Sequence, residues 1–118
     1  MPLLYDNSLG VLNSEVTLAL GGMDLTQNGG STLTVWYRGD SANDPAPMYV
    51  ALDGAKVFDP DPAATLVSVW IQFNVTLQTF ADLGVNTSNA NELGIGVGDG
   101  TAASAGTGTL YVDDIGVH

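Results

Sequence analysis

Hydrophobic and polar residues alternate with a period of two along most of the chain, and no stretch keeps a helical period over about 11 residues. Segments rich in Gly, Pro, Asn and Asp separate the alternating stretches. Many short strands between such turns are typical of an all-β fold built as an antiparallel sandwich or jelly roll. The pattern predicts one short helical turn at "LQTFADLG" and strands over 3–6, 14–20, 31–38, 48–53, 67–77, 92–98 and 108–117.

The alternation also predicts which side of each strand faces the core. Strands 31–38 and 48–53 each carry three apolar residues on one side, and the two inward sets are Leu33, Val35, Tyr37 and Met48, Val50, Leu52. If the two strands form a hairpin, one register pairs both sets on the core side. That register places Trp36 opposite Tyr49 on the outer side.

A set of aromatic and polar residues occupies the predicted outer positions, beside strand 92–98 with glycine at every second position. Alternate glycines let a ring or a ligand approach the backbone closely. Aromatic rings can stack on the apolar face of a sugar, and amides or a guanidinium can bond its hydroxyl groups. The candidate carbohydrate-binding residues are Trp36, Arg38, Tyr49, Trp70, Gln72 and Asn74. The alternative is that a loop covers this side and that both tryptophans belong to a second layer of core.

The composition narrows the range of partners. The 118 residues suit a single domain over 1–118, and folding at this length hides roughly two-thirds of the unfolded surface. The chain has two basic residues, one Lys and one Arg, and thirteen acidic residues, which gives a net charge of −11. Such a surface repels phosphate, so we expect no binding to nucleic acid or to an anionic membrane. A neutral or cationic partner is favoured.

Two adjacent carboxylates, Asp113 and Asp114, interrupt an apolar strand near the C-terminus. The apolar residues are even-numbered before this pair and odd-numbered after it, which predicts a β-bulge of one extra residue. A bulge can aim both carboxylates at one site, and Ca²⁺ is the natural counter-ion for a chain with so few cations. Glu15, which interrupts strand 14–20, is the next candidate ligand. The alternative is a solvated Asp pair at a strand end.

We expect no catalysis. The one histidine is His118, at the end of the chain, so the sequence offers no histidine-based triad or zinc site. Glycoside hydrolysis needs two carboxyl groups across a cleft, one of them with a raised pKa. A sandwich of this length offers little depth for such a cleft.

Five stretches occur in order along the chain: "LTVWYRGD", "PMYVALDG", "WIQFNVTLQTF", "LGIGVGDG" and "GTLYVDDIGV". The series resembles carbohydrate-binding modules with a jelly-roll, galactose-binding-like fold, as found in β-glucan-binding modules of bacterial glycoside hydrolases and in large secreted bacterial proteins. The resemblance implies two antiparallel sheets, a structural calcium ion and sugar binding without catalysis. It implies metal ligands at Asp113, or Asp114, and at Glu15.

Together these arguments predict one calcium-stabilised β-sandwich domain that binds a neutral polysaccharide such as a β-glucan. The chain would be an extracellular module of a longer multidomain protein, and a monomer when isolated. The alternative is a structural or adhesion module that serves as a spacer and has no glycan ligand. An outward pair of tryptophans favours the first possibility, and a buried pair favours the second.

Overall fold

The computed structural model describes residues 2–6, 14–26, 30–44, 46–61, 64–98 and 107–117. Strands make up most of this part of the chain, with one 3₁₀ helix, η2 (Ala64–Leu66), and one α-helix, α1 (Leu77–Asp82). The strands are β1 (Pro2–Asp6), β2 (Ser14–Met23), β3 (Thr32–Arg38), β4 (Met48–Leu52), β5 (Ala55–Phe58), β6 (Ile71–Thr76), β7 (Ala90–Val97) and β8 (Thr107–Val117). The predicted all-β class is confirmed.

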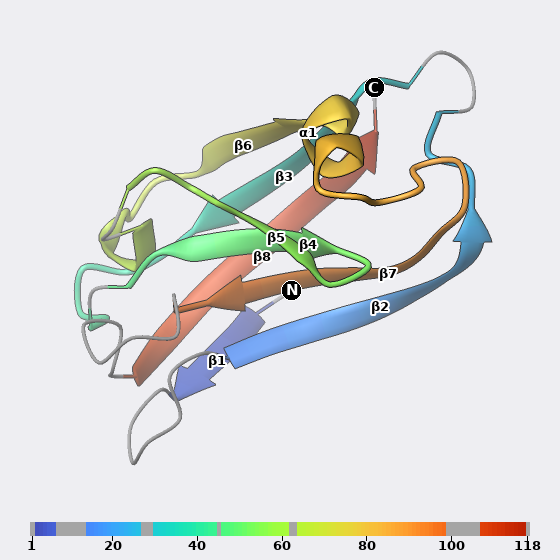
Figure 1. The fold of residues 1–118 in the computed structure, drawn as a ribbon. Coiled ribbons are helices and arrows are strands. Elements are labelled where there is room, and N and C mark those ends of the chain that lie inside the picture. Colours follow the sequence, from blue (N-terminus) through green and yellow to red (C-terminus); the bar gives the residue numbers. More distant parts are fainter. Residues whose placement is uncertain are drawn as a thin grey trace.

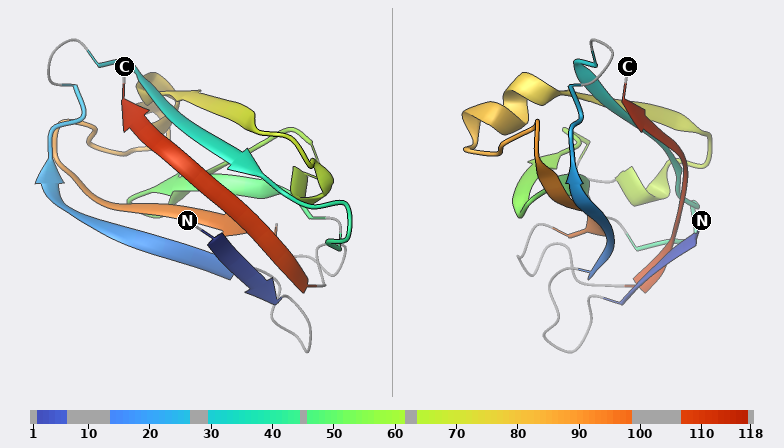
Figure 2. Two further views of the ribbon diagram at one scale, coloured as in Figure 1. Left: turned by 180° about the vertical axis from the view of Figure 1, so that it is seen from behind. Right: turned by 90° about the vertical axis from the view of Figure 1, so that its right-hand side faces the viewer.

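The strands form two four-stranded antiparallel sheets that pack face to face around one apolar core (Figure 1). Sheet A has the order β1-β8-β3-β6, and sheet B has the order β2-β7-β4-β5. Figure 2 shows the two layers from behind and from the side. The predicted antiparallel sandwich is therefore correct.

The predicted hairpin between strands β3 and β4 is wrong. β3 pairs with β6 and β8 in sheet A, whereas β4 pairs with β5 and β7 in sheet B. The inward sets were nevertheless assigned correctly, because all six of their residues are buried. Two strands on opposite sides of one core have the same alternation as two strands of one hairpin, so the pattern alone does not separate these arrangements.

Contacts in the loop after β3 explain why the chain changes sheets. The side-chain nitrogen of Asn43 donates to the backbone carbonyl oxygens of Thr65 and Thr109. The side-chain oxygen of Asn43 accepts from the backbone N–H of Thr109. A Cβ on Gly39 would collide with the Thr65 carbonyl, so the close approach of η2 to this loop requires glycine. These contacts fix the crossing between the sheets.

Strand β5 was missed by the sequence prediction. It pairs with β4 through a two-residue turn, in which Asp53 has φ 48° and Gly54 has φ 87°. Positive φ at both central positions is the signature of a type I′ hairpin turn, for which Asp-Gly is a preferred pair. The Asp53 carboxylate also accepts from the backbone N–H groups of Asn91 and Glu92, which holds the turn against β7.

The predicted helical turn and β-bulge are confirmed, whereas one predicted strand boundary differs. The helical turn is present as α1, which begins after Thr76, whose side chain accepts from the backbone N–H of Thr79. The bulge is confirmed, because Trp36 pairs with Asp113 while Thr34 pairs with Gly116, which leaves one extra residue in β8. The strand predicted from residue 67 instead begins at Ile71.

The core contains one tyrosine that reaches a carboxylate. Tyr37 is 1% exposed, and its hydroxyl donates to Oδ2 of Asp59 at 2.7 Å. Burial, followed by this hydrogen bond and the negative charge of Asp59, raises the pKa of Tyr37 above its ordinary value.

In the described part of the chain, neither helix is long and apolar enough to cross a membrane.

Candidate functional site

The outer side of sheet A brings together polar and aromatic side chains from β3, β6 and β8. Because the odd-numbered residues of β3 are buried in the core, its even-numbered residues point outward. Trp36 lies opposite Gln72 of β6 and opposite Asp113 of β8. Thr34 lies opposite Asn74, and its hydroxyl donates to the Asn74 side-chain oxygen at 2.7 Å. The register of three neighbouring strands thus assembles the site.

Arg38 lies between two aromatic rings on the same side of the sheet. Its Cζ atom is 5.5 Å from the ring centroid of Trp70 and 4.9 Å from that of Tyr111. Both distances allow a cation–π attraction, which orients the guanidinium over the rings. The Arg38 Nε atom is buried and has no hydrogen-bond partner within the described residues. The rings and the sheet therefore fix where this cation sits.

The tryptophans of this face are not part of the core. Trp70 is 44% exposed, Trp36 is partly exposed, and Gln72 and Asn74 are exposed. Neither ring belongs to the cluster of buried side chains between the sheets. We call the set formed by Trp36, Arg38, Trp70, Gln72, Asn74 and Tyr111 the aromatic face. It is an outward arrangement of the kind that the sequence prediction of sugar binding required.

Tyr49 does not belong to the aromatic face. It lies on β4 in sheet B, is fully buried, and packs directly on Gly96 of β7. The Phe58 ring centroid is 5.1 Å from the Tyr49 ring centroid, and Lys56 Nζ is 4.9 Å from it. The expectation that Trp36 faces Tyr49 is therefore wrong. The expectation that alternate glycines admit a ring is right, but the ring is the protein's own.

The sequence prediction missed Tyr111. This residue lies between inward-facing Leu110 and Val112 of β8, so its side chain points outward, where it contacts Arg38. The signal was present in the alternation of "TLYVD". The adjacent carboxylates Asp113 and Asp114 dominate the pattern of this strand, and the outward ring precedes them by two residues.

The predicted metal ligands lie on different sides of the molecule. Glu15 pairs with Gly96 and points outward from sheet B, and its carboxyl carbon lies 2.8 Å from the place where a Cβ on Gly94 would be. Asp113 points outward from sheet A beside Trp36, and the Asp114 side chain lies outside the described part. Glu15 and Asp113 do not face a common site, so they do not fit one shared calcium ion. Within the described residues, no three His, Asp or Glu side chains gather closely enough to hold a metal.

A scan of protein-family models finds no match to this chain, and no curated protein matches it. The geometry of the site is therefore the main evidence for function.

Proposed function

We propose that the chain is a non-catalytic carbohydrate-binding module that binds a neutral polysaccharide, such as a β-glucan, on the aromatic face. The observation that supports this most directly is the arrangement of Trp70, Arg38 and Tyr111, which stack beside the partly exposed ring of Trp36. Large rings held at the surface by neighbouring strands offer a flat apolar platform without prior ordering. Preorganisation of this kind lowers the cost of binding.

The polar groups of the face suit the hydroxyl rim of a sugar. The Asn74 side-chain oxygen already accepts from Thr34, so its amide nitrogen is the group that points a donor to a ligand. Gln72 offers both a donor and an acceptor, and Arg38 offers donors only. The apolar C–H side of a sugar ring would stack on Trp70, as aromatic rings stack on one another. The same face thus supplies both kinds of contact that a sugar needs.

The charge of the chain favours a neutral glycan. A protein of net charge −11 repels an acidic polysaccharide at long range, and Arg38 is the one cation among the residues of the aromatic face. Affinity would be modest, because a flat sheet surface buries only part of each sugar.

The strand order supports the jelly-roll part of the proposal. Successive strands alternate between the two sheets, apart from the β4–β5 hairpin, as expected for eight strands wound as two Greek keys. The composition, with fifteen glycines and two Lys and Arg, supports an extracellular module of a longer protein. Both statements rest on the resemblance noted in the sequence as well.

A calcium ion remains part of the proposal on grounds of charge alone. Eleven uncompensated negative charges repel one another in the folded state, and a bound divalent cation would relieve part of this repulsion. Because Glu15 and Asp113 point outward from different sheets, one ion would use at most one of these two carboxylates.

Affinity gel electrophoresis against a panel of neutral and acidic polysaccharides, with and without EDTA, tests the sugar proposal. We expect the wild type to be retarded by a neutral glycan, and Trp36→Ala or Trp70→Ala to abolish the retardation without unfolding the domain. Phe58→Ala is the matched control, because it removes a partly exposed ring (37% exposed) from sheet B. Folding is monitored by thermal melting of each variant.

Three outcomes would count against the proposal. Folded tryptophan variants that are still retarded would show that the aromatic face is not the site. Unfolding of both variants would show that the rings are structural. A wild type that no polysaccharide retards would favour the spacer or adhesion module instead.

A further inference from the structure

Two Asn-x-Ser/Thr sequences, the acceptor motif for N-linked glycans, occur in the chain. Asn74-Val75-Thr76 lies in β6, and Asn86-Thr87-Ser88 lies in the turn between α1 and β7. The motif alone does not show whether either asparagine can be modified. The structure distinguishes the two, because their side chains have different hydrogen-bond partners and different backbone surroundings.

The chain turns outward after α1 and brings Asn86 to the surface. Gly84 follows the helix with a φ of 93°, and its backbone N–H donates to the carbonyl oxygen of Ala81 at 3.0 Å. The next residue, Val85, packs against the core, whereas Asn86 is exposed. The asparagine therefore projects from a turn whose start is fixed by the helix end and by a core contact.

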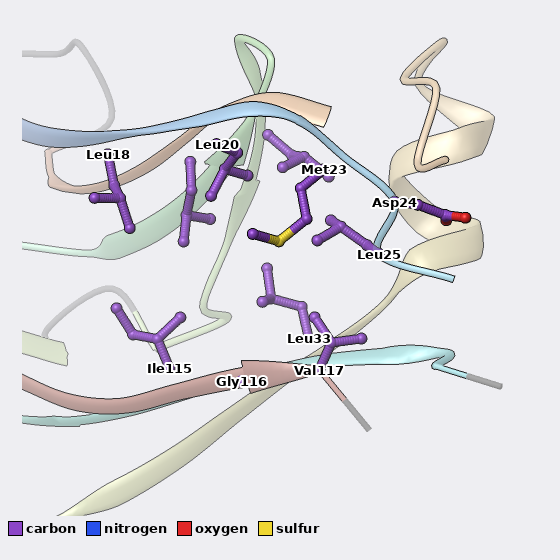
Figure 3. Close-up of a pocket in the computed structure, with 11 residues that line it drawn as sticks. Leu18, Leu20, Met23, Asp24, Leu25, Leu33, Ile115, Gly116 and Val117 are labelled. Atoms are coloured by element: carbon purple, nitrogen blue, oxygen red, sulfur yellow. The ribbon is translucent and has the colours of Figure 1, made fainter. Parts of the chain in front are cut away.

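The middle of this turn is tied to the segment that follows β2. The backbone N–H of Leu25 donates to the carbonyl oxygen of Thr87 at 2.9 Å. Leu25 is 8% exposed and points into the apolar cavity between β2 and β8 (Figure 3). The turn is thus anchored on its inner side, while Asn86 and Ser88 stay exposed.

The side-chain oxygen of Asn86 accepts two hydrogen bonds from Ser88. The Ser88 hydroxyl donates to Oδ1 at 2.7 Å, and the Ser88 backbone N–H donates to the same atom at 3.1 Å. The atom that accepts a sugar is Nδ2, which is a weak nucleophile because its lone pair is delocalised into the carbonyl group. Donors at Oδ1 stabilise the negative charge that the amide gains when Nδ2 loses a proton. The hydroxyl that the motif requires is therefore already placed at the asparagine.

Asn74 lacks this arrangement. Its Oδ1 accepts from the hydroxyl of Thr34 on β3, and the hydroxyl of Thr76 lies 2.8 Å from that of Thr79 at the start of α1. β6 is also paired with β3 over residues 71–76. An enzyme would have to break these contacts and detach β6 before the Thr76 hydroxyl could approach Asn74.

We propose that Asn86 is an attachment site for an N-linked glycan, and that the folded domain accepts the sugar there and not at Asn74. The co-substrate is a sugar activated by a phosphate group on C1, and an N-glycosyltransferase catalyses the transfer. The bond between Nδ2 and C1 forms as the bond between C1 and the phosphate oxygen breaks. The phosphate leaves with the electron pair, and a base of the enzyme takes the Nδ2 proton. The site is separate from the aromatic face and does not depend on its function.

Sugar transfer to the folded chain by a soluble N-glycosyltransferase with uridine diphosphate glucose tests the proposal. Intact-mass spectrometry counts the hexoses, and fragmentation of proteolytic peptides locates them. We expect one hexose per chain, on Asn86. Synthetic peptides that carry each motif in its local sequence are the unfolded controls, and both should be modified. Because Asn74 becomes accessible only when β6 detaches, folding should slow its modification at least about tenfold more than that of Asn86.

Variants of both motifs separate specific transfer from general reactivity. Asn86→Gln and Ser88→Ala should each abolish the modification, and Ser88→Thr should retain it. Asn74→Gln is the matched control, because it makes the same change in the other motif and should leave the modification unchanged. Thermal melting confirms that each variant is folded. A second arm uses a single-subunit oligosaccharyltransferase with a lipid-linked oligosaccharide, which distinguishes a lipid-linked from a nucleotide-linked sugar donor.

Several results would overturn the proposal. Equal rates of modification at Asn74 and Asn86 in the folded chain would show that the folded structure does not select the site. An unmodified folded chain together with a modified Asn86 peptide would show that the turn blocks the transfer. Failure of both enzymes on the chain and on the Asn86 peptide would reject Asn86 as an acceptor.

Discussion

The outer sides of the two sheets contain similar groups but use them differently. On sheet A, a cation lies between two rings, and Trp70 keeps 44% of its surface exposed. On sheet B, a cation again lies over a ring, but that ring, Tyr49, is fully buried against Gly96 and beside Phe58. On sheet A, aromatic surface remains exposed to solvent. On sheet B, the aromatic ring is covered by packing within the protein.

The difference comes from the residues on the neighbouring strand. Trp36 lies opposite Gln72 and Asp113, which both have side chains on the same outer side of the sheet, and its ring stays partly exposed. Tyr49 is flanked by Gly96, which has no side chain, so the ring can lie flat on the backbone. An aromatic residue on the outer side of a sheet can therefore be assigned to a ligand site only when the residues opposite it on the neighbouring strands are known.

The largest effect that we expect comes from filling the space under Tyr49. A Cβ on Gly96 would collide with the Tyr49 ring, which is buried and cannot move without disturbing Phe58. Gly96→Ala should lower the free energy of unfolding by about 3 kcal/mol, the upper range for overpacking. Gly94→Ala is the control, because the atoms nearest to its Cβ would be those of the flexible Glu15 carboxyl, the first at 2.8 Å, and it should change stability by less than about 0.5 kcal/mol. Urea unfolding measures both, and equal losses would refute this account.

The sequence predicts more of the fold than of the site. The inward residues of β3 and β4 follow from alternation, because burial of an apolar side obeys the period of the strand wherever the strand pairs. Which strands pair does not follow, since β3 and β4 would alternate identically in one sheet or in two. The crossing depends on Asn43 and Gly39, which act through contacts distant in sequence.

The sequence prediction missed β5 because it overlooked the residues of the turn before this strand. Asp53-Gly54 follows an apolar strand and precedes "AKVF", which together indicate a type I′ hairpin. The aromatic face shows the opposite case. Arg38 and Trp70 were found from outward positions alone, but their stacking with Tyr111 depends on the order of strands in sheet A, which the sequence does not reveal.

Thermal melting in the presence of Ca²⁺ tests whether the outer side of sheet A or that of sheet B binds an ion. We expect Ca²⁺ to raise the melting temperature more than Mg²⁺ at equal concentration, with a gain of about 2.7 kcal/mol when calcium exceeds its Kd a hundredfold. Asp113→Ala should remove the calcium-specific part, and Glu15→Ala should leave it, because the two carboxylates point away from opposite sheets. Equal shifts with both ions would mean that the cations only screen the charge of −11. An unchanged melting curve in EDTA would remove calcium from the proposal.

We expect a smaller effect on the free energy of unfolding from the buried Tyr37 of β3, for which the outward Tyr111 of β8 is the comparison. Tyr37→Phe should cost about 2 kcal/mol near neutral pH, because it removes a hydrogen bond to the Asp59 carboxylate. The raised pKa of Tyr37 means that the folded state holds its proton more tightly than the unfolded state. This stabilisation is complete below about pH 10, the ordinary tyrosine pKa, and decreases as the pH rises further.

The wild type should therefore lose about 1.4 kcal/mol more than Tyr37→Phe between pH 9 and pH 11. Denaturant unfolding at both pH values measures this difference. Tyr111→Phe is the control, and it should follow the pH dependence of the wild type. A Tyr37→Phe protein with the same alkaline loss as the wild type would contradict the assignment.

The smallest effect on stability comes from the two cations that lie over rings. Arg38→Ala and Lys56→Ala should each cost about 1 kcal/mol or less, the usual size of a cation–π contact near the surface. Their effects on glycan binding should differ. Removing the Arg38 guanidinium uncovers Trp70 and Tyr111 and deletes donors, so the order of preference among glycans in the affinity gel should change while binding persists. Removing Lys56 leaves Tyr49 buried against Gly96, so the order should stay the same.

Arg38→Lys sharpens this test of the two faces. Lysine keeps the charge but loses the planar group that stacks on both rings, so it should behave like alanine if stacking sets the preference and like arginine if charge does. We expect the alanine-like result, because Trp70 and Tyr111 both lie at stacking distance from the guanidinium. A change of glycan preference in Lys56→Ala would show that sheet B takes part in binding, and the contrast between the two outer sides would then fail.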